Sequence, residues 1–94
     1  MIAFTGSAAT GRAIQADAAS VGVKNVSLEL GGKNPMVVLP DADLDSAVNG
    51  AVVGMNLPVC QGQSCGSNSR ILVHEGGFEA FQTKLIKAMA GLRV

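Results

Sequence analysis

The sequence predicts an α/β fold in which parallel strands alternate with helices. Short apolar runs of strand length recur between longer segments with helical spacing, and glycines or prolines separate the two kinds of segment. The composition agrees, because the chain of 94 residues is 48% hydrophobic but has no Trp, no Tyr and only three Phe. A core built from Val, Leu, Ile, Ala and Met suits the packing of helices on a sheet.

The first part of the chain has the pattern of a strand, a tight turn and a helix. Residues 1–5 are an apolar run that ends at Gly6 and Ser7, and the alanine-rich residues 8–21 predict a helix. We expect Ser7 to cap this helix and Gly22 to end it, since Gly adopts a left-handed backbone without steric cost.

Two more strands are expected next. Residues 25–30 alternate in polarity and stop at a pair of glycines, so one face should be apolar, with Val26, Leu28 and Leu30. Residues 36–39 form a continuous apolar run that predicts a strand buried on both faces and closed by Pro40.

The rest of the chain predicts two helices around one further strand. The first helix should be capped by Asp41 or Asp43 and run to about Leu57, where Pro58 stops it. Residues 71–74 predict a strand, and residues 78–92 an amphipathic helix that turns Lys84 and Lys87 to solvent and has apolar positions at Phe78, Phe81, Leu85 and Met89. Because a strand starts near residue 1 and residues 92–94 look like the entry to another, we expect a piece of a larger protein.

The charge and the composition argue against several classes of function. The formal net charge is zero and the seven basic residues are scattered, so we expect neither nucleic acid nor a membrane as a partner. Residues 47–59, the longest weakly polar run, are too few for the roughly 20 apolar residues of a membrane span. The N-terminus lacks the pattern of a secretory signal, so a cytoplasmic location is expected. Two cysteines and one histidine predict neither a disulfide framework nor a metal site.

A glycine-rich turn precedes the first predicted helix. The spacing of Gly6 and Gly11 fits a phosphate-binding loop, but Arg12 and Ala13 replace its Lys and its magnesium-binding hydroxyl, which excludes ATP hydrolysis by that loop. Two interpretations remain open. The free N–H groups of the helix could face an anion such as a pyrophosphate, or the turn is an ordinary capped one.

Two other positions could carry chemistry. Glu29 closes a strand before two glycines, where a carboxylate at the rim of a parallel sheet can act as a general base or can simply be solvated. Cys65 lies among small and polar residues that leave room for a substrate, and a thiol near backbone N–H donors can become a nucleophile. A buried structural thiol is the alternative for Cys65 and our interpretation of Cys60, and His74 is expected to be a polar strand-end residue.

Taken together these motifs resemble the aldehyde dehydrogenase family. The resemblance covers nearly the whole chain and rests on four motifs in the family's order and spacing: Phe4-Thr-Gly-Ser7 with Gly11, Leu28-Glu-Leu-Gly-Gly-Lys-Asn-Pro35, Asp41-Ala-Asp-Leu-Asp45, and Gly62-Gln-Ser-Cys65 with Arg70. The second and the fourth are similar to the family's two active-site signatures, and their joint occurrence is more specific than either one alone.

The resemblance implies an enzyme that oxidises an aldehyde to a carboxylic acid with NAD or NADP. Cys65 would be the nucleophile that forms a thiohemiacetal and then a thioester, and its N–H would help to stabilise the oxyanion, a type of contribution of roughly 3–4 kcal/mol. Glu29 would activate the hydrolytic water. Gly6 and Ser7 would lie against the cofactor pyrophosphate, with Leu30 and Gly31 beside the nicotinamide.

The resemblance also implies which part of such an enzyme this is. Residues 1–33 would end a Rossmann-like dinucleotide-binding domain and residues 34–94 would begin the catalytic domain, so the chain would be a fragment that is inactive alone. Its partners would be the aldehyde, the remainder of the parent chain and further copies in a dimer or tetramer. The family's oxyanion-hole Asn, its two ribose-binding residues and its oligomerisation strands are not found, and Ser67 and residues 57–59 depart from the usual pattern near the thiol.

Two other functions remain as alternatives. The parent could be a CoA-acylating relative that passes the acyl group to a thiol, although such relatives usually lack the carboxylate that Glu29 provides. The chain could instead be a truncated, non-catalytic packing or interaction module.

Overall fold

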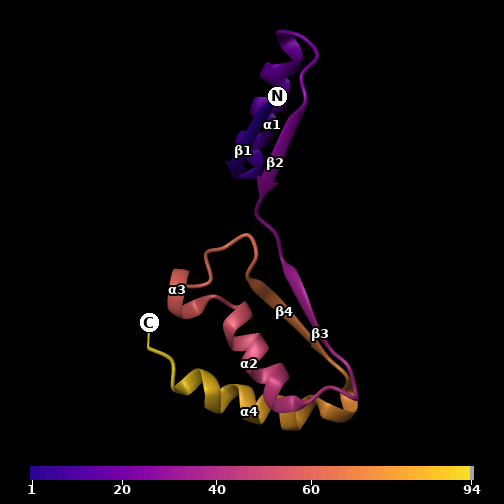
Figure 1. The fold of residues 1–94 in the computed structure, drawn as a ribbon, viewed down its shortest axis with the longest axis vertical. Coiled ribbons are helices and arrows are strands. Elements are labelled where there is room, and N and C mark those ends of the chain that lie inside the picture. Colours follow the sequence, from indigo (N-terminus) through magenta and orange to yellow (C-terminus); the bar gives the residue numbers. More distant parts are fainter. Residues whose placement is uncertain (94) are drawn as a thin grey trace. The chain divides into compact units, whose positions relative to one another are not determined.

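The computed structural model describes residues 1–93, which divide into two compact units (Figure 1). The first unit is Met1–Gly32 and the second begins at Lys33. This boundary lies next to the predicted domain boundary, whereas the assignment of the units to a cofactor domain and a catalytic domain stays a prediction. Within residues 1–93, none of the helices has the length and apolar character needed to cross a membrane.

The first unit is a strand, a helix and a strand, as the sequence predicts. Strand β1 (Ile2–Gly6) leads into helix α1 (Ala8–Ser20), and strand β2 (Val26–Leu30) returns parallel to β1. The predicted ends of the helix are confirmed, because the Ser7 hydroxyl accepts a hydrogen bond from the Thr10 N–H at 3.2 Å and Gly22 has a φ of 135°.

Helix α1 packs closely on one face of β2. A Cβ atom on the buried Gly11 would lie 3.2 Å from a methyl group of Leu30 and 3.3 Å from one of Leu28. The predicted alternation of β2 is confirmed, since Val26, Leu28 and Leu30 are half-buried while the residues between them are exposed. The face of β2 that carries Glu29 is therefore the one turned away from α1.

The second unit is built on another parallel pair, β3 (Asn34–Val38) and β4 (Asn68–Val73). Between them in the chain lie α2 (Leu44–Gly54) and the single turn α3 (Leu57–Cys60), and β4 is followed by the 3₁₀ turn η1 (Glu75–Gly77) and helix α4 (Phe78–Ala90). Figure 1 shows α2 and α4 on the same side of the two strands. Their contact encloses the core of the unit, which consists of Val38, Val48, Ala51 and Phe81.

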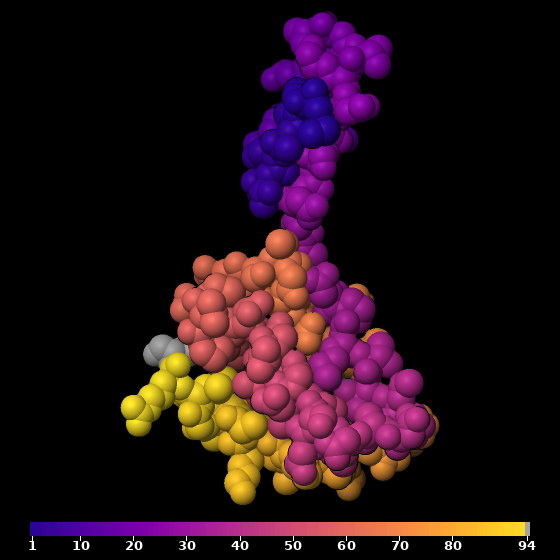
Figure 2. Space-filling view, viewed as in Figure 1, coloured from indigo at the N-terminus to yellow at the C-terminus, as the bar shows by residue number. Residues whose placement is uncertain are grey.

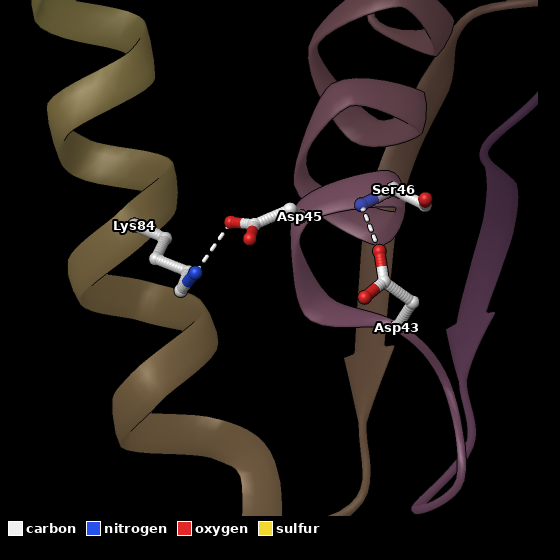
Figure 3. Close-up of polar contacts among 4 residues, drawn as sticks. All are labelled: Asp43, Asp45, Ser46 and Lys84. Atoms are coloured by element: carbon white, nitrogen blue, oxygen red, sulfur yellow. Dashed lines mark hydrogen bonds and ion pairs between the residues drawn. The ribbon is translucent and has the colours of Figure 1, made fainter.

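Two polar contacts hold the start of α2 (Figure 3). Asp43, one of the two predicted caps, accepts a hydrogen bond at 2.8 Å from the Ser46 N–H. This bond, strengthened by the Ser46 side chain, holds the pKa of the exposed Asp43 carboxyl below its usual value. Asp45 forms an ion pair with Lys84 of α4, which ties the two helices together at their exposed edge.

Several expectations for the second unit are wrong, and the first ones concern β3 and the end of the chain. The run from Met36 to Leu39 is not buried on both faces, because Val37 and Leu39 are 59% and 61% exposed. Within residues 1–93 the two helices cover one face of the pair only, and the strand itself starts earlier than predicted and includes Pro35. Of the expected strand entry, residues 92 and 93 are irregular and residue 94 lies outside the described residues.

A further correction concerns Pro58, which does not stop α2. The helix ends at Gly54 and the chain then turns at Asn56, whose φ of 54° is left-handed. Pro58 lies at the start of the separate turn α3, where its missing N–H costs nothing.

Candidate functional site

The parallel pairing of β1 and β2 brings five candidate residues to one edge of the first unit, namely Glu29 and the four predicted cofactor residues. Thr5 lies opposite Glu29 and Gly6 lies opposite Leu30, so both strands finish together. Ser7 follows the end of β1, and Gly31 follows the end of β2. Ligands of open parallel sheets bind outside this carboxyl edge, so the topology gathers the predicted cofactor residues where such a ligand would lie.

The turn between β1 and α1 exposes backbone on the α1 side of this edge. A side chain at Gly6 would place its Cβ 2.6 Å from the end of the Phe4 ring, so a larger residue there would have to displace that ring. Ser7 is exposed and is bonded to Thr10 through both the N–H and the hydroxyl of that residue. The first N–H groups of the 13-residue α1 point out of the same turn, a setting that favours an anion.

Glu29 and Gly31 present different chemistry at the same edge. The Glu29 side chain is exposed on the face turned away from α1. A Cβ built on Gly31 would meet no atom of the described residues within 4 Å, so the backbone is open to an approaching molecule. This edge therefore offers a carboxylate, a bare backbone and a helix N-terminus.

Cys65 lies in the second unit, on the loop of residues 61–67 between α3 and β4. It is exposed and free, and the loop lies on the surface of the unit (Figure 2). The loop is tied by its own backbone, since the Gln63 N–H donates to the Cys60 carbonyl at 2.9 Å and the Ser67 N–H donates to the Ser64 carbonyl at 3.1 Å. Within residues 1–93, no acceptor is paired with the N–H of Cys65 itself.

Four hydrogen bonds in and around this loop were not predicted from the sequence. The Asn34 side-chain amide donates to the Cys65 carbonyl and, at 3.4 Å, to the Ser67 carbonyl. The Ser64 hydroxyl accepts from the Gly66 N–H at 3.2 Å, and Arg70 Nε donates to the Lys33 carbonyl at 2.8 Å. Asn34 and Cys65 are 31 positions apart, and only the adjacency of Asn34 to the Gly-Gly motif could have drawn attention to it.

The other cysteine and the histidine have local structural partners. Cys60 is half-buried and its thiol donates to the Asn56 carbonyl at 3.4 Å. His74 follows β4, at the end of the strand remote from Cys65, and its Nδ1 accepts from the Gly76 N–H at 3.2 Å. Among the described residues, no three His, Cys, Asp or Glu side chains gather in a way that could hold a metal ion.

A hollow of about 460 Å³ lies beside the loop in the second unit. Leu57 lines it, together with Ser67, Ile71 and Met89, whereas Cys65 does not. The Ser67 hydroxyl is buried and has no hydrogen-bond partner among the described residues. Leu57 and Ser67 are two of the positions at which we expected a departure from the pattern of the family that the sequence resembles.

Comparison with known proteins gives a consistent result over the whole chain. The pattern of the aldehyde dehydrogenase family matches residues 1–94. The mitochondrial succinate-semialdehyde dehydrogenase of Oryza sativa subsp. japonica is 45% identical over 93 residues, which are 99% of this chain and 17% of the rice protein.

Solved structures agree with the sequence match. The crystal structure of succinate-semialdehyde dehydrogenase from Burkholderia pseudomallei superposes with a TM-score of 0.89 at 44% identity, over 98% of this chain and 18% of that one. An NAD⁺ complex of aldehyde dehydrogenase from Bacillus cereus gives a TM-score of 0.87 at 42% identity, over 97% of this chain and 18% of its own. The chain therefore spans less than a fifth of the length of these relatives.

Proposed function

This chain belongs to the aldehyde dehydrogenase family, and from that premise we propose that it supplies the nucleophile and the general base for NAD- or NADP-dependent oxidation of an aldehyde to a carboxylic acid. The observation that carries the proposal is the exposure of Cys65, on a loop held by backbone hydrogen bonds, in a chain of this family. The exposed Glu29 at the carboxyl edge of β1 and β2 supports the hydrolytic half of the reaction.

In the proposed reaction the Cys65 sulfur, as the thiolate, adds to the aldehyde carbon and forms a thiohemiacetal. The N–H of Cys65 donates to the oxygen on which negative charge develops. A bound nicotinamide would supply the hydride acceptor, and loss of a hydride from that carbon would leave a thioester on Cys65. Glu29 then takes a proton from water, and the water oxygen adds to the thioester carbon. The carbon–sulfur bond breaks to release the carboxylic acid and the Cys65 thiolate, while the proton on Glu29 passes to solvent.

The residues at the carboxyl edge of the first unit fit a dinucleotide. Gly6, Ser7 and the N-terminus of α1 would hold the pyrophosphate, because N–H groups and the positive end of the helix dipole favour an anion. Leu30 and Gly31 would lie beside the nicotinamide, where the open backbone of Gly31 admits a flat ring. In this proposal residues 1–33 end the cofactor domain and residues 34–94 begin the catalytic one.

Substitution of the two cysteines tests the nucleophile. In the complete protein that carries these residues, Cys65→Ser should abolish aldehyde-dependent formation of NADH or NADPH. Cys60→Ser is the matched control, because that thiol is half-buried against the Asn56 carbonyl, and it should retain most of the activity. Equal loss from both variants would refute the role of Cys65.

A separate experiment tests Glu29 as the general base. Glu29→Gln should keep a pre-steady-state burst of reduced cofactor and lose steady turnover, because acylation precedes the step that needs the water-activating carboxylate. If the burst also disappears, Glu29 is not confined to hydrolysis. Addition of CoA separates the two enzyme alternatives, since a CoA-acylating enzyme would release an acyl-CoA and depend on the added thiol.

The chain spans less than a fifth of its relatives, and we propose that on its own it has little or no activity. Assembly of the parent enzyme as a dimer or tetramer stays a prediction that sedimentation would test. A cytoplasmic location also stays a prediction, and a reducing compartment would keep Cys65 as a thiol.

A further inference from the structure

We propose that Asn34 is a positioning residue for Cys65. It would hold the peptide unit that follows the cysteine, and so keep the thiol and the Cys65 N–H aimed at one substrate carbonyl. The inference rests on the function proposed above, because it assumes that Cys65 is the nucleophile.

The peptide unit between Cys65 and Gly66 is held at both ends. Its carbonyl oxygen accepts a hydrogen bond from the Asn34 amide, and its N–H donates to the Ser64 hydroxyl at 3.2 Å. The same Asn34 nitrogen lies 3.4 Å from the Ser67 carbonyl, so its two hydrogens serve two carbonyls of one loop. Rotation of this peptide unit would therefore break contacts on both of its sides.

The backbone of Asn34 is itself held in place by the pairing of β3 and β4. It is the first residue of β3 and lies opposite Asn68, the first residue of β4. Pro35 follows it and restricts the Asn34 backbone to extended conformations. Arg70 adds a second bond between the two strand starts, from its Nε to the Lys33 carbonyl at 2.8 Å.

The pairing at this point also favours contact with the loop. Asn34 is opposite Asn68 but Pro35 is opposite Arg70, so Ser69 is an extra residue on β4. An irregularity of this kind bends the strand and directs a side chain away from the regular ladder. Asn34 is half-buried and its bond to the Ser67 carbonyl is partly shielded from water, whereas Cys65 and its bond with Asn34 are exposed.

This arrangement matters because thiol addition has two geometric requirements at once. The sulfur must reach the carbonyl carbon while an N–H donor lies at the oxygen on which charge develops. Both groups belong to Cys65, so a displacement of the backbone of this one residue moves both of them away from the substrate carbonyl. Asn34 fixes the peptide plane on the carboxyl side of Cys65, and the thiol itself does not need Asn34 in order to be present or exposed.

Two variants and one control test the inference in the complete protein. Asn34→Ala removes the amide, and Asn34→Asp keeps its shape but replaces the donor with an acceptor that repels both carbonyls. Asn68→Ala is the control, because its half-buried amide donates to Met36 Sδ at 3.7 Å and, among the described residues, makes no hydrogen bond to the loop of residues 61–67. A misplacement of about 1 Å can cost about 100-fold, so both Asn34 variants should slow the aldehyde-driven burst about 10- to 100-fold, with KM within about threefold.

Two further measurements separate positioning from a general loss of structure. Alkylation of Cys65 by iodoacetamide needs a thiol but no oxyanion donor, so its rate should change far less than the burst. Deuterium uptake by a peptide covering residues 61–67 should rise in both Asn34 variants and stay at the wild-type level in Asn68→Ala. If Asn34→Ala does not fold, the isosteric Asn34→Asp gives the same comparison.

The inference is overturned by unchanged deuterium uptake in the loop, or by a burst as fast as that of the wild type. It is also overturned if alkylation slows by the same factor as the burst, because Asn34 would then act on the thiol alone. A wild-type protein with no aldehyde-dependent burst would instead refute the proposed function, and the uptake measurement would still report whether Asn34 holds the loop.

Discussion

Phe81 should be the most sensitive core position of the second unit, and Phe78 in the same helix provides its control. Phe81 is 2% exposed and packs with Val38, Val48 and Ala51, whereas Phe78 is 48% exposed. Full burial of such a side chain stabilises by roughly 1.5–3 kcal/mol, and an enclosed cavity adds to the loss when the ring is removed. We therefore expect Phe81→Ala to lower the free energy of unfolding by about 3–5 kcal/mol.

The same reasoning gives a smaller loss for the control. About half of the Phe78 surface remains in water, so Phe78→Ala gives up about 1 kcal/mol and leaves no enclosed cavity. Urea unfolding followed by circular dichroism would compare the two variants with the wild type. Equal losses would refute the reasoning, because they would mean that α4 does not close a core over β3 and α2.

Three further predictions concern the helices. The hydrogen bond from the Ser46 N–H lowers the pKa of Asp43 in the folded protein. This cap therefore stabilises the folded state at pH values above the unfolded pKa of about 3.8, and the stabilisation is lost as the pH falls through the lower folded pKa. The urea midpoints of wild type and Asp43→Ala should therefore approach each other at low pH. Gly50→Ala, whose new Cβ would lie 3.7 Å from the nearest methyl group, should stabilise by about 0.5–1 kcal/mol. Gly11→Ala should gain less, because its Cβ would press on two leucines of β2 at 3.2 and 3.3 Å; the reverse order in thermal unfolding would contradict this packing. Lys84→Ala should change the free energy of unfolding by less than about 1 kcal/mol, because both partners of its ion pair are well exposed, and a larger loss in urea would show that the pair matters more.

Local rules predicted much of the fold. The Ser7 cap, the glycine end of α1 and the alternation of β2 follow from interactions between residues a few positions apart, and the structure confirms them. Pro58 was misjudged because a proline suits the first turn of a helix as well as the residue after one, and the left-handed Asn56 decided between the two. The burial of Val37 was overestimated, since an apolar run shows that a strand can be buried without showing what covers each face.

The sequence by itself determined which reactive groups are present, namely the thiol of Cys65, the carboxylate of Glu29 and the glycine turns. Residue type and local spacing are properties of the sequence alone. It also indicated the family, which the comparisons confirm. Only the tertiary structure decided how the loop of residues 61–67, which carries Cys65, is held. Strand pairing brings Asn34 to the Cys65 carbonyl across 31 positions of sequence, and no local pattern encodes a contact made by two strand starts that meet in space.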